Sequence, residues 1–452
     1  MQKIIVQGAG FVGSAFAIAC ASIKNKNILF DVTIVEKKIQ KKLINQINSG
    51  IFPFETNDKK LSLLLKKHIK KNLHISTSEN KYKIADIVVS CIGFDCEYSL
   101  SSFNKNKKKY QKSIEAIAKK ISPKSLLIIQ STLPPGFTNN FIKPILEKQF
   151  LKRNLNFEDL LLCHSFERVM PGKNYYDSIV NNWRVCAGIN QKSIDKSKEF
   201  FSKLVNIKKF PITYFNNPIY SEVAKVLENS YRAINIGFID EWSRFAEMAQ
   251  IDLFKIIKSI QLRPTHKNMM LPGFGVGGYC LTKDPKFIKI SAAHIYKTNK
   301  LKFPYMKLGL ETNKKMPVNT FNKIRKYFSN KLRKKKILIL GVSYKDGVAD
   351  TRKSPTEILY EKLKKKGALI YLHDPLVRYW SEKKINIKKK LPNFNDYNVV
   401  VLATNHDEYK KIIFHKKFNS KNFYLLLDAV NLVNDNEKNK LGKNIKLLSI
   451  GK

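Results

Sequence analysis

Two regions of the chain show the same order of local patterns: an apolar run that ends at a glycine, a helix-like stretch, and a second apolar run that ends at an acidic residue. In the first region the run KIIVQ ends at Gly8 and the second run ends at Glu36. In the second region the corresponding runs end at Gly341 and Asp374. Because strands that alternate with helices form parallel sheets with crossover helices, this repetition predicts two α/β domains of similar plan.

Further apolar runs predict more strands of these sheets. They cover residues 84–92, 125–130 and 159–163 in the first half, and NVVVLATNHDE and FYLLLDAVN contain one each in the second half. The middle is different, since residues 219–250 contain no proline and read as one long helix. A helix of this length predicts a spine between the domains, and such elements commonly provide a subunit interface.

Composition and charge limit the classes of protein. A chain of 452 residues with 43% hydrophobic residues predicts a folded protein of two or three domains. A formal net charge of +47 would suit a nucleic-acid-binding protein, but the lysines are spread through the chain and no module pairs them with aromatic residues. We therefore interpret most of them as solvated surface and expect no specific nucleic-acid partner, although a positive field suits a substrate with a diphosphate.

Cysteine spacing and the absence of long apolar segments restrict the chain further. The six cysteines form no CxxC pair, which argues against a disulfide framework and a structural zinc site. No apolar stretch reaches the ~18 residues that span a bilayer. The first apolar run begins at once, which leaves no room for a signal peptide. These features predict a cytoplasmic protein with neither a membrane partner nor a bound metal.

The first glycine segment, GAGFVG at residues 8–13, has the form of a dinucleotide-binding turn. Gly8 permits the tight turn, Gly10 lets the backbone approach a pyrophosphate, and Gly13 lets the helix pack on the strand. The helix N-terminus then offers N–H groups to the phosphates. Glu36 can accept both ribose hydroxyls and repels a 2′-phosphate, so NAD is predicted over NADP, although the two lysines that follow Glu36 weaken this preference.

The segment GFGVGGYCLTKDP, residues 273–285, predicts the reactive group. Its four glycines let the backbone approach a ligand closely, and Cys280 follows them, with Lys283 and Asp284 next along the chain. A single cysteine is most often a small buried hydrophobe. Here the setting is polar and rich in glycine, and a nearby ammonium favours the thiolate, so Cys280 is predicted to be a nucleophile.

Three further clusters are candidates for the same site, each with a structural alternative. Lys225 and Asn229 are four residues apart on the long helix and share a face, as they would on a solvated helix surface. Glu167 and Arg168 precede a Pro-Gly turn, where a salt-bridged loop would explain them equally well. Thr132 follows a strand and can face a ligand, although the PPG sequence shortly after it is a turn in its own right.

Six ordered motifs span nearly the whole chain: GAGFVG, STLPPGFT, FERVMPG, EVAKVLENSYR, GVGGYCLTKDP and GVSYKDGVADTRKSP. In these motifs the chain resembles the UDP-glucose/GDP-mannose dehydrogenase family. The resemblance implies an α/β fold with two Rossmann-like parallel-sheet domains joined by a central helical domain with one long helix. The expected domains are NAD-binding at residues 1–213, helical and dimerising at 214–320, and UDP-sugar-binding at 321–452, in a homodimer or higher homo-oligomer.

The reaction that the resemblance implies is an NAD-dependent, four-electron oxidation of carbon 6 of a UDP-sugar to the carboxylate. After a first hydride transfer Cys280 adds to the aldehyde as a thiohemiacetal, and a second transfer leaves a thioester that water hydrolyses. Lys225 and Asn229 would stabilise oxyanions, and Asp284 would handle protons or water. Thr132 and Glu167 match the residues that position water.

The family's functional residues fall on defined positions of this chain. The catalytic set is Cys280, Lys225, Asn229, Asp284, Glu167 and Thr132. The cofactor-binding set is Gly8, Gly10, Phe11, Val12, Gly13, Glu36, Gly93, Thr132, Lys283 and Arg352. The substrate-binding set is Glu167, Arg168, Lys225, Asn229, Phe274, Gly275, Gly277, Gly278, Tyr344 and Lys345.

The identity of the sugar stays open at this point. TLPPG and ERVMPG resemble the branch that oxidises UDP-N-acetylhexosamines. Lys283 beside Asp284, and Tyr279 in place of a histidine, resemble the UDP-glucose branch. Departures from the family pattern remove no reacting group, although Phe94, which stands in place of a threonine, affects one cofactor hydrogen bond.

Two other classes of protein are alternatives. A β-hydroxyacid dehydrogenase pairs a similar cofactor domain with a lysine–asparagine helix, but it needs neither Cys280 nor a second nucleotide domain at 334–452. Its reaction yields one NADH per substrate, whereas the four-electron oxidation yields two. A dehydrogenase-like protein that has lost activity would not need the intact set of Lys225, Asn229, Cys280 and Asp284.

Overall fold

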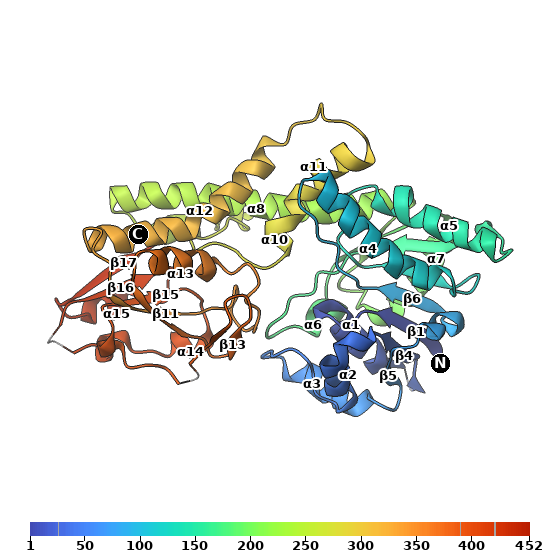
Figure 1. Ribbon diagram of the computed structural model, residues 1–452, viewed down its shortest axis with the longest axis horizontal. Helices are drawn as coiled ribbons and strands as arrows, with labels where there is room; N and C mark the ends of the chain where they lie inside the picture. The colour runs from blue at the N-terminus through green and yellow to red at the C-terminus, as the bar shows by residue number, and fades with distance from the viewer. Residues whose placement is uncertain (26, 389, 420–421) are drawn as a thin grey trace. The chain divides into compact units, whose positions relative to one another are not determined.

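The computed structural model describes residues 1–25, 27–388, 390–419 and 422–452. The chain divides into two compact units, the first made of Met1–Glu228 and Lys286–Lys302, the second of Asn229–Pro285 and Phe303–Lys452. Each unit contains one large sheet with helices against it, blue to green in the first unit and orange to red in the second (Figure 1).

The sheet of the first unit is almost entirely parallel. In the described part of the unit, eight strands follow the order β10-β9-β8-β7-β6-β1-β4-β5. Only the β8–β9 pair is antiparallel among these described strands. The connection between these two contains just the four-residue helix α6 (Asp177–Val180), whereas parallel neighbours need a crossover, usually a longer helix. The strands are β1 (Gln2–Gln7), β4 (Phe30–Val35), β5 (Leu73–Ser76), β6 (Ile87–Ser90), β7 (Leu126–Ile129), β8 (Leu161–His164), β9 (Arg184–Gly188) and β10 (Ile212–Phe215).

Helices cover both faces of this sheet because its strands bury side chains on both sides. In β1, Ile4 and Val6 pack into one core, and Ile5 between them packs into the other. The first core includes residues of α1 (Phe11–Ser22), α2 (Lys41–Asn48), α3 (Lys59–His68) and α7 (Gln191–Leu204). The second includes residues of α4 (Leu100–Ala118), α5 (Lys143–Lys152) and the short α11 (Phe287–Ile290). A two-residue hairpin, β2 (Lys24–Asn25) with β3 (Asn27–Ile28), lies outside the sheet.

Several predicted strands differ from the observed ones at their ends. The runs at 31–35, 125–130 and 159–163 correspond to β4, β7 and β8. The run at 84–92 is a strand only over β6, because Glu79–Ile84 forms a 3-10 helix. The strands β5, β9 and β10 were not predicted, and β10 extends across residue 213, so the expected domain end falls inside a strand.

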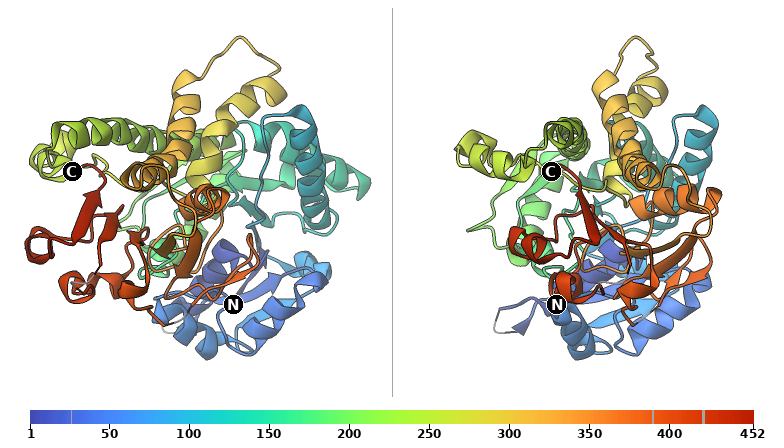
Figure 2. Two further views of the ribbon diagram at one scale, coloured as in Figure 1. Left: turned by 60° about the vertical axis from the view of Figure 1, so that its left-hand side comes forward. Right: turned by 90° about the vertical axis from the view of Figure 1, so that its left-hand side faces the viewer.

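The predicted long helix is present as α8 (Pro218–Ala249), a continuous helix of 32 residues coloured green in Figures 1 and 2. A row of large apolar side chains along it is exposed, at spacings of three, four and seven residues that keep them on one stripe. They are Tyr220, Leu227, Tyr231, Phe238, Trp242, Phe245 and Met248. Exposed apolar side chains thus form a continuous stripe along α8, unlike the scattered single apolar residues usual on a protein surface.

The second unit contains the second predicted parallel sheet. In the described residues its order is β12-β11-β15-β16-β17, with all pairs parallel. The strands are β11 (Lys336–Leu340), β12 (Leu369–His373), β15 (Val399–Leu402), β16 (Tyr424–Asp428) and β17 (Ile445–Ser449), of which β17 was not predicted. The two-α/β-domain fold class with a central long helix is therefore confirmed.

Helices also border the second sheet. Residues of α12 (Pro304–Tyr327) and α13 (Pro355–Lys365) pack into the core on one face, and Tyr409 of α14 (Asp407–Lys410) packs on the other. The remaining elements of the unit are the helices α9 (Leu253–Ile260), α10 (Cys280–Lys283) and α15 (Asp435–Lys440), and the hairpin of β13 (Tyr379–Trp380) and β14 (Ile385–Asn386).

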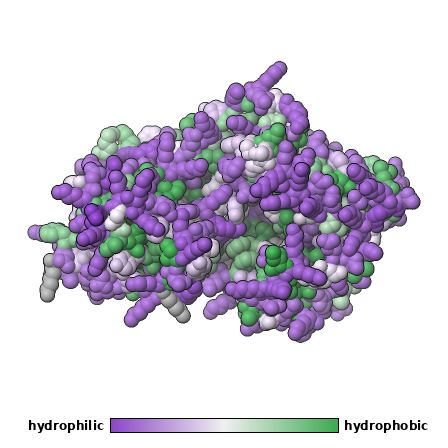
Figure 3. Space-filling model, viewed as in Figure 1, coloured by the Kyte–Doolittle hydropathy of each residue, from purple (hydrophilic) through white to green (hydrophobic). Residues whose placement is uncertain are grey.

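One face of the molecule can be judged from its hydropathy. On the face shown in Figure 3 hydrophilic residues prevail and apolar ones form scattered groups. Among the residues that the structure describes, no helix combines the length and apolar character that a membrane span requires.

Candidate active site

The glycine turn after β1 has the geometry that a dinucleotide-binding loop requires. Gly8 has φ +95°, a conformation that favours glycine. A Cβ on Gly13 would lie 2.0 Å from the carbonyl oxygen of Gly8 and 3.3 Å from Cβ of Cys91, so only glycine lets α1 approach the turn this closely. A Cβ on Gly10 would meet no described atom within 4 Å, which leaves the outer side of the turn open to a ligand. These residues fit a bound pyrophosphate at the start of α1.

A pocket of about 190 Å³ lies at the carboxyl ends of β1, β4 and β6, and Glu36 and Tyr82 are among its lining residues. This edge of a parallel sheet is where nucleotides bind. Glu36 accepts hydrogen bonds from the amides of Ala9 at 2.7 Å and Lys37 at 2.8 Å, one on each carboxylate oxygen. Each oxygen keeps a second lone pair for a ribose hydroxyl. Lys37, one of the two lysines that weaken the preference for NAD over NADP, lines the same pocket.

Gln7 and Tyr82 are among the lining residues that sequence reasoning missed. Gln7, the last residue of β1, donates from its side-chain amide to the carbonyl of Ser113 at 2.8 Å and accepts from the hydroxyl of Ser90 at 2.8 Å. Tyr82 is buried beside it, and burial raises the pKa of its phenol. A polar residue that ends an otherwise apolar strand was the signal available for Gln7.

Two of the other cofactor residues named from the sequence are Gly93, in the loop after β6, and Phe11, the half-buried first residue of α1. Gly93 is exposed, and a Cβ there would meet no described atom within 4 Å. Phe11 stacks on Phe54 with ring centroids 4.0 Å apart. Phe94, by contrast, is 2% exposed and packs against Tyr110 and Phe137, so its side chain serves the core.

Glu167 is buried at the end of β8 among polar partners from several elements. Its Oε1 accepts from Arg184 at 2.5 Å and from the side-chain amide of Gln130 at 2.9 Å. Lys225 on α8 donates to the backbone carbonyl of Glu167 at 3.1 Å. Burial raises the pKa of Glu167, against the opposing charges of Arg184 and Lys225. Thr132 lies half-buried in the loop that follows β7, three residues beyond its last one.

Arg168 lies in a salt-bridged loop, which was the structural alternative for this residue. Its guanidinium pairs with Glu228 at 2.8 Å and donates to the carbonyl of Trp183. A salt-bridged loop therefore accounts for this residue in the structure, and a role in substrate binding would require it to exchange these partners.

A buried carboxylate on α8, Glu222, was also missed. It accepts from the amide of Gly136 at 2.6 Å and from the amide and hydroxyl of Thr138 at 2.8 and 2.6 Å. Burial raises its pKa to about 7 against these hydrogen bonds. Glu222 thus anchors the loop after β7, which contains Thr132, to the helix of Lys225.

In the second unit, Asn229 and Asp284 are brought together by the fold. The amide of Asn229 donates to Oδ2 of Asp284 at 2.6 Å, and the ammonium of Lys283 lies 3.5 Å from Oδ1. Asp284 is 1% exposed. The alternative in which Asn229 faces solvent is wrong, since its side chain is buried in this polar contact.

Cys280 is the first residue of α10 and is exposed, whereas the other cysteines of the chain are buried or half-buried. The alternative of a buried small hydrophobe therefore fails at this position. Tyr344 lies near it, because the negative charge of the Cys280 thiolate contributes to the raised pKa of the Tyr344 phenol, after burial and Asp350. Cys280, the residue that the sequence predicted to be the nucleophile, is therefore exposed to solvent.

The glycines before Cys280 allow close packing of backbone against the segment 344–353. A Cβ on Gly277 would lie 2.4 Å from the carbonyl oxygen of Lys353, and one on Gly278 would lie 2.8 Å from the ring of Tyr344. The amide of Gly278 donates to the carbonyl of Arg352 at 2.9 Å. Arg352 in turn lies over the ring of Tyr279, 4.6 Å from its centroid.

Three substrate residues predicted in this region differ in exposure. Phe274 is 3% exposed and packs in the core of the second unit, so its side chain is unavailable to a ligand and only its backbone remains. Lys345 is exposed and Tyr344 half-buried.

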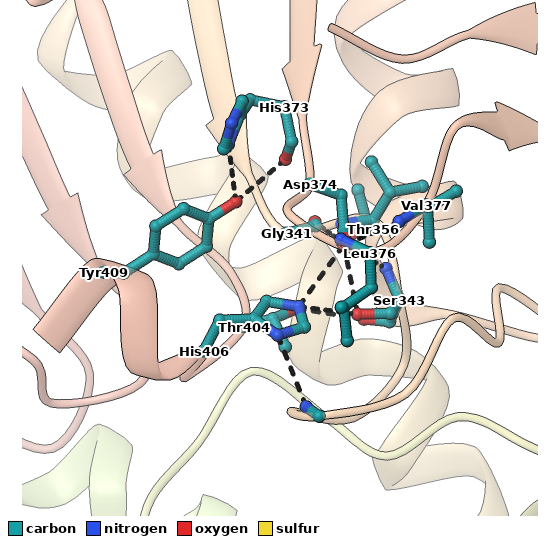
Figure 4. A network of polar contacts seen from close by, with 12 residues as sticks. Gly341, Ser343, Thr356, His373, Asp374, Leu376, Val377, Thr404, His406 and Tyr409 are labelled. Carbon is teal, nitrogen blue, oxygen red and sulfur yellow. Dashed lines mark hydrogen bonds and ion pairs between the residues drawn. The ribbon is translucent and has the colours of Figure 1, made fainter. Parts of the chain in front are cut away.

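The second domain has a glycine turn like that of the first, but its acidic residue, Asp374, has different surroundings from Glu36. Gly341 has φ +108°, like Gly8. Asp374, which corresponds to Glu36 in the pattern, is 0% exposed and accepts from the amides of Val342 at 2.8 Å and Ser343 at 2.9 Å on Oδ2 (Figure 4). Asp374 therefore holds its own loop together, and it is closed to a ribose.

A glycine turn that opens a helix, beside a pocket at the carboxyl ends of the strands, defines the first domain as the cofactor domain of a dinucleotide-dependent dehydrogenase. The family models give the same result in more detail. The NAD binding, central and UDP binding domains of the UDP-glucose/GDP-mannose dehydrogenase family match residues 2–205, 220–315 and 338–435. The chain belongs to this family, is an NAD-dependent oxidoreductase and takes a UDP-sugar as its substrate.

Full-length relatives support this assignment. The chain is 30% identical over 460 residues to a UDP-N-acetyl-D-mannosamine dehydrogenase of Methanococcus vannielii, covering 100% of this chain and 98% of that protein. It is 24% identical over 443 residues to a UDP-glucose 6-dehydrogenase of Rickettsia prowazekii, covering 96% and 97% of the two. A solved UDP-D-ManNAc dehydrogenase from Pyrococcus horikoshii shares the fold, with a TM-score of 0.79, 24% identity and coverage of 100% and 99%.

Proposed function

We propose that the chain oxidises carbon 6 of UDP-N-acetyl-D-mannosamine to the carboxylate, in two steps through a thioester on Cys280. The observation that supports the chemistry is the exposed Cys280 in a glycine-rich segment, in the same unit as the buried pair of Asn229 and Asp284. The sugar is supported by the full-length relatives of that name and by the motifs TLPPG and ERVMPG.

Each residue has a defined task in this proposal. NAD, when bound at the glycine turn, accepts the hydride in each oxidation. The thiolate of Cys280 forms a C–S bond with the aldehyde carbon, and the resulting oxyanion takes a proton to give the thiohemiacetal. Lys225 and Asn229 stabilise the oxyanion, as cationic and amide donors do. In the last step a water oxygen bonds to the thioester carbon, the C–S bond breaks, and the sulfur leaves as thiolate.

We also propose the three domains that the sequence predicted, 1–213, 214–320 and 321–452, except that the first boundary moves beyond β10, which ends at Phe215, and the second moves beyond α12, which ends at Tyr327. The family models, which match three separate segments, support three domains.

The substrate proposal is tested by incubating the protein and NAD with UDP-N-acetyl-D-mannosamine, UDP-N-acetylglucosamine, UDP-glucose, UDP-galactose and GDP-mannose. We expect UDP-N-acetyl-D-mannosamine to give the highest kcat/KM and two NADH per sugar consumed. A higher kcat/KM with UDP-glucose would contradict the sugar. A yield of one NADH per sugar would contradict the four-electron reaction and favour a hydroxyacid-type dehydrogenase.

We further propose that the apolar stripe of α8 forms the interface of a homodimer. A single helix face repeated in a second copy can pack against itself in a two-fold interface. Trp242→Glu is expected to raise the dimer dissociation constant on the order of 100-fold, because it buries a charge in an apolar interface. Sedimentation at micromolar concentration measures this, with Phe423→Glu, an exposed phenylalanine of the second unit, as the control. A Trp242→Glu protein that sediments as the wild type does would rule the stripe out.

A further inference from the structure

We infer that Arg184 is a positioning residue that fixes the carboxylate of Glu167 so that one oxygen, Oε2, holds the water consumed in thioester hydrolysis. This inference rests on the proposed function, because it concerns the last step of the same reaction. No feature of the sequence motifs singled out Arg184, which lies 17 residues beyond Glu167 in the sequence, at the start of β9.

The two oxygens of Glu167 have different surroundings. Oε1 accepts from Arg184 at 2.5 Å and from Gln130 at 2.9 Å, which uses its lone pairs. Oε2 is buried and has no hydrogen-bond partner among the residues that the structure describes. Because a buried carboxylate oxygen is costly to leave unsatisfied, Oε2 is the place for a bound water.

Arg184 is itself held rigidly, as a positioning role requires. It is 5% exposed, its Nη2 lies 3.5 Å from the carbonyl oxygen of Ile179, and its guanidinium lies over the ring of Phe201, 4.7 Å from the centroid. Because Arg184 is fixed in this way, its short hydrogen bond to Glu167 also fixes the position of the carboxylate.

The second donor to Oε1 connects Glu167 to the cofactor turn. The side-chain oxygen of Gln130 accepts from the thiol of Cys91 at 3.3 Å, and Cys91 packs directly against Gly13 of the turn. Within the first unit the chain of contacts thus runs from the glycine turn through Cys91 and Gln130 to Glu167 and Arg184. The water at Oε2 is held by a network that is continuous with the cofactor loop.

Charge is the second contribution of Arg184. Burial raises the pKa of Glu167, while the charge and hydrogen bond of Arg184, the charge of Lys225 and the backbone amide of Arg168 lower it. The other titratable groups that interact with this carboxyl are the thiols of Cys20 and Cys91, whose pKa values burial raises, so both are neutral. Arg184 is therefore the group that most strongly opposes protonation of Glu167, the residue that would accept a proton from the attacking water.

The test separates hydrolysis from the earlier steps. Arg184→Gln enzyme is mixed with NAD and UDP-N-acetyl-D-mannosamine, NADH is followed from the first turnover, and the quenched protein is weighed by intact-mass spectrometry. We expect a burst of two NADH per site, a steady-state rate lower on the order of 100-fold, and accumulation of the acyl adduct. The acid limb of the pH–rate profile moves to higher pH, because Glu167 loses the charge that opposes its protonation.

Three variants make the result interpretable. Arg184→Lys restores part of the hydrolysis rate, because it returns the charge without the planar guanidinium that contacts both Glu167 and the carbonyl of Ile179. Gln130→Met removes the other donor to Oε1 and also accumulates adduct, which keeps the test valid if Arg184→Gln does not fold. Arg153→Gln is the matched control, since this half-buried arginine of the same unit donates only to the carbonyls of Ala118 and Ile121 in the described residues and leaves hydrolysis unchanged.

The outcomes distinguish the inference from the function on which it rests. Glu167→Gln is the reference variant and should accumulate the same adduct. Suppose that Glu167→Gln accumulates the adduct, whereas the folded Arg184 and Gln130 variants lose both the burst and the steady-state rate and form no adduct. The positioning role of Arg184 is then wrong, and the proposed function stands. If the wild type yields one NADH and no variant, Glu167→Gln included, forms an adduct, the covalent four-electron reaction itself is wrong.

Discussion

Cys280→Ser is expected to bind NAD and the UDP-sugar as the wild type does and to lose at least about 10³-fold in kcat. In the proposed reaction the thiol of Cys280, an exposed residue at the start of α10, forms the thiohemiacetal, and a serine hydroxyl is a far weaker nucleophile at neutral pH. Because the substitution changes one exposed atom, the binding sites for the two nucleotides are left intact. Equilibrium binding of each ligand and NADH production together measure the effect.

A matched control is available in the same chain. Cys20→Ala removes a thiol that is fully buried in α1 and cannot take part in the covalent step, and we expect kcat to stay within about twofold. Labelling with a thiol reagent should block the wild type and leave Cys280→Ser unmodified. Near-normal NADH production by Cys280→Ser would eliminate the covalent route and leave a direct oxidation of the hydrated aldehyde.

Asp374→Asn is expected to lower the free energy of unfolding of the second unit by about 3 kcal/mol. The carboxylate accepts from two amides on each oxygen: those of Val342 and Ser343 on Oδ2, and those of Leu376 and Val377 on Oδ1. An asparagine presents N–H groups to one of these pairs of donors, so two buried hydrogen bonds are replaced by repulsive contacts (Figure 4).

The fluorescence of Trp380 reports this change during urea unfolding, because Trp380 is fully buried in the second unit while Trp183 and Trp242 are 58% and 48% exposed. Asp396→Asn, on the surface of the same unit, is the control and should change the free energy by less than about 0.5 kcal/mol. An Asp374→Asn midpoint equal to that of Asp396→Asn would show that the loop does not depend on the carboxylate.

The same residue predicts a pH dependence with a definite sign. Although burial alone would raise it, the pKa of Asp374 is lowered from 3.8 to about 2 by the hydrogen bond and charge of His406 and by the amides of its loop. A depressed carboxyl pKa contributes stability that is fully present above pH about 4 and is lost as the pH falls toward 2. The acid sensitivity of the second unit should therefore shrink in Asp374→Asn.

The sequence predicted most of the fold because the relevant signals are local. Apolar runs that end at glycine, and the uninterrupted pattern of residues 219–250, correspond to β1, β11 and α8. Four sheet strands escaped prediction. Strands such as β5 (LHIS) and β17 (IKLLS) are short and mix polar with apolar residues, so only pairing with a neighbour makes them strands.

The candidate site was predictable to the extent that single residues reveal their chemistry. Cys280 could be named from its glycine-rich and polar neighbours in the chain. Arg184 could not, because its importance comes from a contact with Glu167 that the β8–β9 pairing creates. Phe274 was assigned to the substrate from its place in a motif, whereas packing in the core removed its side chain from the surface.

Glu36 and Asp374 show which properties the sequence determines and which ones depend on the tertiary structure. The sequence by itself determined that each ends the second strand of a parallel sheet, next to a glycine turn, since that much follows from the order of apolar runs. Only the tertiary structure decided that Glu36 borders an open pocket, while Asp374 is sealed by Ser343, His406 and its own loop. The physical reason is that burial depends on which side chains surround a carboxylate in three dimensions, and burial decides whether its lone pairs serve a ligand or the fold.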